Sequence, residues 1–137
     1  MALLVVSALG LCVAACGGGQ ASGSSARADT PATDAANAFL RTYTTDGGRI
    51  QRTDQGGDTV GEGQAYGLLA AAAVGDEQRF DEIWAWTEQN MLNSDGLLAF
   101  RWVNGKVVDP TPAADADLDA ARALLVASCR FGRSDLK

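Results

Sequence analysis

Residues 59–75 read TVGEGQAYGLLAAAAVG, and this stretch decides the fold. Between Gly61 and Val74 the residues favour a helix, and Gly75 provides its stop signal. Its many small side chains, above all the alanines at 70–73, allow neighbouring helices to approach closely. The sequence therefore predicts a helix that packs tightly against its neighbours.

Three further helices and one hairpin surround this stretch in the sequence. Thr30-Pro31 is an N-cap followed by a proline at the first helical position, and Thr111-Pro112 repeats that pattern. Asp76 is expected to cap another helix directly after Gly75. Asn104-Gly105 joins two short apolar segments and predicts a β-hairpin. We therefore expect an all-α fold with a small β-hairpin insertion.

The expected core follows from apolar residues at helical spacing. It includes Cys129, which falls on the apolar stripe of the fourth helix and is expected to be a buried small hydrophobe rather than a reactive thiol. The full set is Phe39, Leu40, Leu68, Leu69, Phe80, Ile83, Trp84, Met91, Leu118, Leu125 and Cys129.

Composition excludes several classes of function. The chain of 137 residues contains 17 acidic and 11 basic residues, a net charge of −6, and no histidine. The negative charge disfavours nucleic acid as a partner, because binding to phosphates needs a basic surface. Without histidine, Ser-His-Asp catalysis, Cys-His catalysis and His-ligated zinc are excluded. No metal and no cofactor are expected, and acid-base chemistry has to come from carboxylates.

The first 15 residues, MALLVVSALGLCVAA, carry no charge and end in small residues, as a secretory signal peptide does. Val13-Ala14-Ala15-Cys16 resembles the lipobox of bacterial lipoproteins, which predicts lipidation of Cys16 and a membrane anchor. The alternative is an ordinary signal peptide with an incidental cysteine. The lack of Lys or Arg ahead of the apolar stretch favours this alternative. Residues 16–32 are predicted to form a flexible tether, and residues 33–137 the folded part. The expected location is exported, either membrane-anchored or extracellular.

Two acidic motifs are candidates for chemistry. Glu62 lies between two glycines at a predicted helix start, where the missing side chains give a ligand access. Asp115, Asp117 and Asp119 lie in the first turns of the fourth helix, and Asp115 and Asp119 share a face. The alternative for both motifs is a favourable interaction with the helix dipole. A calcium site is disfavoured because alanines occupy the alternate positions.

These motifs, together with Asp95-Gly96 and the residues that follow to Trp102, resemble glycoside hydrolase family 8 over roughly residues 35–131. The resemblance implies part of an (α/α)6 barrel, about four of its twelve helices. Known members are inverting, endo-acting enzymes on β-1,4-linked glucan, chitosan or xylan, with glucan the commonest substrate.

The resemblance also implies residue roles. Glu62 matches the general acid, and Asp115 matches the aspartate that grips the sugar at the cleavage point. The family's base lies much further along its chains, so this chain is expected to be a truncated N-terminal fragment without it. The sequence departs from the family pattern at four positions: Gly61, Phe100, Ala114 and Ala120. The hydroxyls that the family usually has at positions 61 and 114 are missing, which puts the hydrogen-bond support of both carboxylates in doubt.

A flat aromatic ring complements the apolar face of a sugar. Tyr66 lies one helical turn beyond Glu62, and Phe100 and Trp102 share one face of the predicted hairpin. We expect these three, with Asp117 and Asp119, to bind substrate; Trp84 and Trp86 are better explained as core.

The predicted partner is a β-1,4-linked polysaccharide, and the oligomeric state stays open. The competing hypothesis is a non-catalytic helical lipoprotein that binds glycan or a protein; a purely structural lipoprotein leaves both motifs unexplained.

Overall fold

The computed structural model describes residues 30–45 and 47–137. The predictions of a signal peptide, of lipidation at Cys16 and of most of the tether therefore lie outside the described residues. Within them, no helix is long and apolar enough to cross a membrane.

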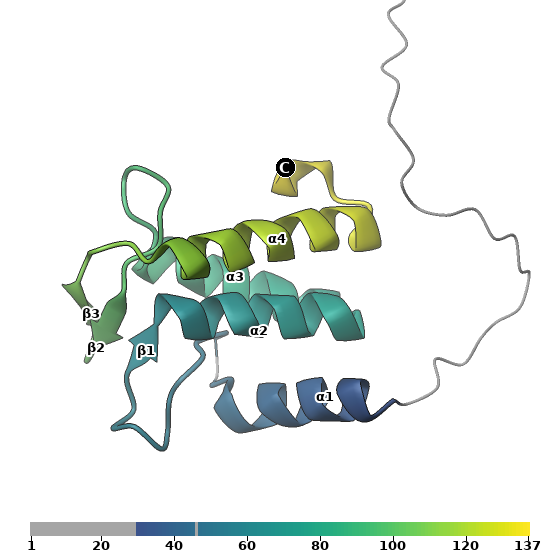
Figure 1. Ribbon diagram of the computed structural model, residues 1–137, viewed down its shortest axis with the longest axis horizontal. Coiled ribbons are helices and arrows are strands. Elements are labelled where there is room, and N and C mark those ends of the chain that lie inside the picture. The colour runs from purple at the N-terminus through teal and green to yellow at the C-terminus, as the bar shows by residue number, and fades with distance from the viewer. Residues whose placement is uncertain (1–29, 46) are drawn as a thin grey trace, which may run out of the picture.

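The described chain is mostly helical, as predicted. It contains α1 (Pro31–Tyr43), α2 (Gly61–Val74), α3 (Glu77–Asn90), α4 (Ala114–Phe131) and a short 3-10 helix, η1 (Ser134–Leu136). In Figure 1, α2 and α4 lie side by side and run in the same direction, with α1 beside α2. The N-terminal ends of α2 and α4 therefore lie at the same end of the molecule.

The predicted cap signals set three of the helix ends in the described chain. The Thr30 side chain accepts a 3.2 Å hydrogen bond from the Thr33 N–H, with Pro31 at the first helical position. Gly75 ends α2 in the left-handed conformation, at φ 79°. Asp76 then caps α3 by accepting a 3.1 Å bond from the Arg79 N–H.

The predicted start of α4 is wrong. Its N-cap is Ala113, which has no side chain able to cap, and not Thr111. Two X-Pro units in succession keep residues 109–112 extended. Asp109 closes a turn in this segment by accepting a 2.9 Å hydrogen bond from the Thr111 N–H. The helix therefore begins two residues after the second proline, at Ala114.

The predicted hairpin is the outer part of a three-stranded antiparallel sheet. Its strands are β1 (Thr59–Val60), β2 (Arg101–Val103) and β3 (Lys106–Asp109), in that order. Asn104 and Gly105 form the tight turn with φ values of 49° and 88°. Strand β1 was not predicted, because two residues are too few for a strand pattern. It matters for the site, since it leads directly into α2.

The contact between α2 and α4 is built from small residues. The alanines at 116, 120, 123 and 127 form the buried stripe of α4, while Ala65, Ala71 and Ala72 are buried on α2. The prediction that Leu118, Leu125 and Cys129 belong to the core is wrong, because all three are exposed. Two helices that approach closely bury their smallest stripe, so the larger side chains of α4 face outward.

The remaining predicted core is confirmed in large part. Leu40, Leu68, Phe80, Ile83 and Met91 are almost fully buried. Phe39, Leu69 and Trp84 are partly buried and packed against that core.

A buried glutamine joins the loop after α1 to both α2 and α3. Gln64 Oε1 accepts a 2.6 Å hydrogen bond from the Ile50 N–H, and its Nε2 donates a 2.7 Å bond to Thr87 Oγ1. Gln64 is fully buried, so both bonds are sheltered from water. They fix Ile50, in the loop that follows α1, beside the start of α2.

Candidate functional site

Glu62 is the second residue of α2, and its side chain is exposed. The chain just before β2 crosses the start of this helix, where the Gly61 N–H donates a 3.0 Å hydrogen bond to the Phe100 carbonyl. A Cβ atom on Gly61 would lie only 2.9 Å from the Ala99 carbonyl oxygen. Glycine at position 61 is therefore required by the close approach of residues 98–100.

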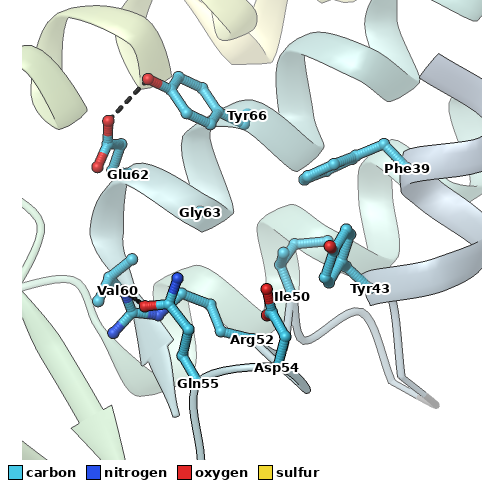
Figure 2. Close-up of a pocket in the computed structure, with 10 residues that line it drawn as sticks. All are labelled: Phe39, Tyr43, Ile50, Arg52, Asp54, Gln55, Val60, Glu62, Gly63 and Tyr66. Carbon is cyan, nitrogen blue, oxygen red and sulfur yellow. Dashed lines mark hydrogen bonds between the residues drawn. The ribbon is translucent and has the colours of Figure 1, made fainter. Parts of the chain in front are cut away.

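Tyr66 and Glu62 are directly bonded. The Tyr66 hydroxyl donates a 2.7 Å hydrogen bond to Glu62 Oε1 (Figure 2). This bond and the charge of Glu62 raise the pKa of Tyr66, and the charges of Asp119 and Asp115 add smaller effects in the same direction. Asp115 and Asp119, at the start of the neighbouring α4, are thus near enough for their charges to act on the Tyr66 phenol.

Asp115 occupies on α4 the position that Glu62 occupies on α2. Each is the second residue of its helix, and the two helices are neighbours. The Asp115 side chain is exposed, and its Oδ1 accepts a 2.9 Å hydrogen bond from the Ala116 N–H. Asp119, one turn later, is partly buried. Accessible carboxylates on adjacent helix starts are suited to proton transfer and to binding sugar hydroxyls.

Asp117 is not brought into this group. Its Oδ1 accepts a 2.8 Å hydrogen bond from the Leu98 N–H, and it faces the loop that precedes β2. This hydrogen bond holds that loop against α4, so the role of Asp117 here is structural.

The aromatic candidates differ in their surroundings. The Trp102 ring packs edge-on against Trp86, with centroids 5.3 Å apart, and the Arg49 guanidinium lies over it at 4.4 Å. Trp102 is thus already engaged by two side chains. Phe100 is 44% exposed and Tyr66 also 44%, so both rings remain accessible.

An arginine cluster around Asp58 was not predicted. Asp58 is 2% exposed; Arg52 donates two hydrogen bonds to its carboxylate, at 2.8 and 2.6 Å, and Arg101 donates one at 2.6 Å. The Arg52 bonds contribute most to a lowered pKa of Asp58, although burial opposes the shift. Asp58 and Arg101 are far apart in sequence, so no local pattern reveals the pair.

Arg49 completes the anchoring of this loop. It donates a 2.8 Å hydrogen bond to Thr59 Oγ1 and another to the Gly57 carbonyl. Burial lowers the pKa of Arg49, and the nearby charge of Asp58 partly offsets that effect. Together the three arginines hold residues 49–58 against β1 and β2.

A groove of about 400 Å³ opens between α1, this loop and the start of α2 (Figure 2). Phe39 and Tyr43 line it from α1, and Arg52, Asp54 and Gln55 from the loop. Glu62 and Tyr66 border it on α2. Sequence reasoning missed this groove because Phe39 has the spacing of a core residue and residues 50–58 have the composition of an ordinary loop.

No cation site is evident in the described part of the chain. No three of its Cys, Asp and Glu side chains are grouped so that they could hold a metal ion.

Comparisons with known proteins show which family the sequence matches. The chain matches the family model described as glycosyl hydrolases family 8 over residues 16–135. A probable endoglucanase of Novacetimonas hansenii is 37% identical over 131 residues, which are 90% of this chain and 38% of that protein. An endoglucanase of Pseudomonas fluorescens is 34% identical over 99 residues, covering 66% of this chain and 25% of that protein.

The fold is also shared. The structure of an endo-beta-1,4-glucanase from Acetobacter xylinum superposes with a TM-score of 0.72 and 35% identity, covering 77% of this chain and 34% of that one. The chain therefore spans only part of these relatives: 38%, 25% and 34% of their lengths. Because the family model covers most of the sequence and the fold matches part of the family's helical barrel, this chain belongs to glycosyl hydrolase family 8.

Proposed function

We propose that this chain forms part of the catalytic domain of an endo-acting hydrolase of β-1,4-linked polysaccharide, with glucan as the preferred substrate. The observation that carries the proposal is the hydrogen bond between Tyr66 and Glu62 at the start of α2, with Asp115 and Asp119 in the first turns of the neighbouring α4. Relatives described as endoglucanases support the choice of glucan.

In the proposed reaction Glu62 is the general acid. Its carboxyl proton passes to the glycosidic oxygen as the bond to the anomeric carbon breaks, so that the departing sugar leaves as an alcohol. The Tyr66 hydroxyl, 2.7 Å from Glu62 Oε1, fixes the direction of the carboxyl group. Asp115 binds hydroxyls of the sugar at the cleavage point and favours its distorted ring.

The proposed mechanism is inverting. A water molecule attacks the anomeric carbon from the face opposite the leaving group, and a second carboxylate takes its proton. That base stands about 6.5–9.5 Å from the acid in inverting enzymes. We assign it to the part of the family's domain that this chain does not span. The chain alone is therefore expected to lack hydrolytic activity.

A chimera tests the catalytic role. Residues 35–131 would replace the matching stretch of the Novacetimonas hansenii endoglucanase, and release of reducing sugar from carboxymethyl cellulose, xylan and chitosan would be measured. The chimera should be active on cellulose, and Glu62→Gln should lower its rate by about 10²–10⁴. Glu88→Gln, on the exposed face of α3, is the matched control and should leave the rate unchanged.

Two outcomes would contradict the proposal. One is a folded chimera that releases no sugar, which would favour a non-catalytic glycan-binding or protein-binding lipoprotein. The other is full activity in Glu62→Gln. Hydrolysis by the unextended chain that disappears in Glu62→Gln would instead show that a carboxylate within the chain, such as Asp119, acts as the base.

We also propose that Cys16 is lipidated and anchors the exported protein to a membrane. The support is the motif Val13-Ala14-Ala15-Cys16 with a tether-like segment behind it. Membrane fractionation should find the wild type and Cys12→Ser in the membrane and Cys16→Ser in the soluble fraction. Equal release of all three would contradict the anchor.

A further inference from the structure

Buried hydrogen bonds hold the chain on both sides of Glu62. Thr59, three residues before it, donates a 2.8 Å hydrogen bond from Oγ1 to the Ile50 carbonyl. Gln64, two residues after it, accepts a 2.6 Å hydrogen bond at Oε1 from the Ile50 N–H. The backbone N–H and C=O of one loop residue are therefore bonded to both flanks of Glu62.

The Ile50 side chain packs against the same helix. A Cβ atom on Gly67 would lie only 2.6 Å from Ile50 Cγ1, so the glycine at this position allows Ile50 to approach α2. Ile50 is 2% exposed, and Thr59 and Gln64 are fully buried. Water therefore has no access to replace these bonds, and the start of α2 cannot move away from the loop without losing them.

Thr87 on α3 continues this set of bonds. Gln64 Nε2 donates a 2.7 Å hydrogen bond to Thr87 Oγ1, and Thr87 Oγ1 donates a 2.7 Å bond to the Ile83 carbonyl. The direction of each bond is fixed, because the Ile50 N–H needs the amide oxygen of Gln64 and leaves the NH2 group for Thr87. Loss of the Thr87 hydroxyl would leave that buried NH2 group without its acceptor.

We propose that Gln64 and Thr87 are positioning residues for Glu62, an inference that rests on the proposed function. Both are fully buried, so neither is accessible to a substrate. They act by holding the first turn of α2 against α3 and against Ile50. A small displacement of a reacting group can lower a rate by up to about 10². The Thr87 hydroxyl should therefore affect kcat and leave KM unchanged.

Hydrogen exchange in the intact chain tests these bonds without requiring catalysis. Thr87→Val removes the hydroxyl and keeps the shape of the side chain, whereas Thr87→Ser keeps the hydroxyl. In ¹H–¹⁵N spectra the Ile50 amide should exchange about tenfold faster in Thr87→Val than in wild type, and within about twofold of wild type in Thr87→Ser. The Leu68 amide, in the middle of α2, should change less.

Thr42→Val is the matched control. The Thr42 hydroxyl also donates to the carbonyl four residues earlier, at 2.8 Å, but it is exposed on α1. This variant makes the same chemical change as Thr87→Val without leaving a buried donor unpaired. It should leave the exchange rate of the Ile50 amide unchanged.

The chimera with the Novacetimonas hansenii endoglucanase gives the catalytic readout. Thr87→Val should lower its kcat on carboxymethyl cellulose about tenfold and change KM by less than about twofold. Thr87→Ser and Thr42→Val should leave both constants close to those of the parent chimera.

Gln64→Glu is the second variant, for use if Thr87→Val does not fold. Its protonated carboxyl group offers the same acceptor and donor as the amide, whereas its ionised form has no donor for Thr87. Its kcat relative to the parent chimera should therefore fall between about pH 5 and about pH 8, and a constant ratio would overturn the proposal.

Other outcomes separate this inference from the proposed function. An unchanged kcat in folded Thr87→Val, or an equal loss of kcat in Thr87→Val and Thr87→Ser, would overturn the positioning role. Equal acceleration of exchange at Ile50 and Leu68 would also overturn it, because it indicates a general loss of stability. A folded parent chimera without activity would instead contradict the proposed function, with the Ile50 exchange rates still as predicted.

Discussion

The Tyr66 hydroxyl donates a 2.7 Å hydrogen bond to Glu62 Oε1, one turn earlier on the same helix. The bond places a neutral donor beside the carboxyl group that we assign as the acid. It also makes Tyr66 a reporter of that carboxyl group, because the bond and the charge of Glu62 both raise the pKa of Tyr66.

The first prediction concerns this titration. Tyr43 and Tyr66 are the two tyrosines of the chain, so a Tyr43→Phe background leaves Tyr66 as the single phenol. Glu62→Gln should move the pKa of Tyr66 back toward its ordinary value of 10.0, measured by phenolate absorbance. Because the pKa is raised in the folded state, this pair stabilises the protein below about pH 10 and loses that effect as pH rises through the folded-state pKa.

Glu88→Gln serves as the control in the same background and should leave the titration of Tyr66 unchanged. An identical phenolate curve for Glu62→Gln and its parent would mean that the 2.7 Å bond does not persist in solution.

The second prediction concerns Asp58, whose carboxylate is 2% exposed and bonded to Arg52 and Arg101. Asp58→Asn should lower the free energy of unfolding by about 2–3 kcal/mol at neutral pH, less than for a fully buried ion pair because both arginines are partly exposed. Asp54→Asn, on the exposed part of the same loop, should change it by less than about 0.5 kcal/mol. Urea unfolding measures both.

The pH dependence of this effect has a defined sign. The pKa of Asp58 is lowered below its ordinary value of 3.8 by its bonds to arginine. The stabilisation is therefore present above about pH 3.8 and disappears as pH falls through the folded-state pKa. A difference between wild type and Asp58→Asn that stays constant down through this range would contradict the assignment.

The sequence predicted helix ends and turns correctly where one residue type determines them. Thr30, Gly75, Asp76 and the Asn104-Gly105 turn all act as their residue types suggest. The fourth helix shows the limit of such reasoning. Hydrophobicity favoured Leu118 and Leu125 as core, but the close packing of α2 against α4 selects alanines instead. Which stripe is buried depends on the neighbouring helix, and that information is not local.

The same limit applies to the site. Glu62, Tyr66 and Asp115 could be chosen from short motifs and from the family resemblance. The groove and the bond between Arg101 and Asp58 could not, because Phe39 lines the groove with Glu62, and Arg101 reaches Asp58, only after distant segments have folded together. No spacing within one segment encodes these contacts.

The third prediction separates backbone strain from collision at two adjacent glycines. Gly47 and Gly48 both have positive φ, 83° and 89°, so alanine is strained at either position. A Cβ on Gly47 meets nothing within 4 Å, whereas a Cβ on Gly48 would collide with the backbone carbonyl of Glu82 on α3. Gly47→Ala should cost about 1 kcal/mol.

Gly48→Ala should cost about 3 kcal/mol more, because α3 has to move away from the loop. Thermal unfolding followed by circular dichroism compares the two variants. Equal melting temperatures would show that the loop does not lie against α3 as closely as described.

The last prediction tests which face of α4 is buried. Ala123 is fully buried against α2, and Ala121, two residues earlier on the same helix, is exposed. Ala123→Leu inserts a large side chain into the closest helix contact and should lower the free energy of unfolding by about 1–3 kcal/mol. Ala121→Leu makes the same chemical change on the open face and should alter it by less than about 0.5 kcal/mol. Chemical unfolding of the two variants measures this difference directly. If Ala121→Leu were the more destabilising change, the stripe of Leu118, Leu125 and Cys129 would be the packed face after all, and the sequence-based core would replace the one described.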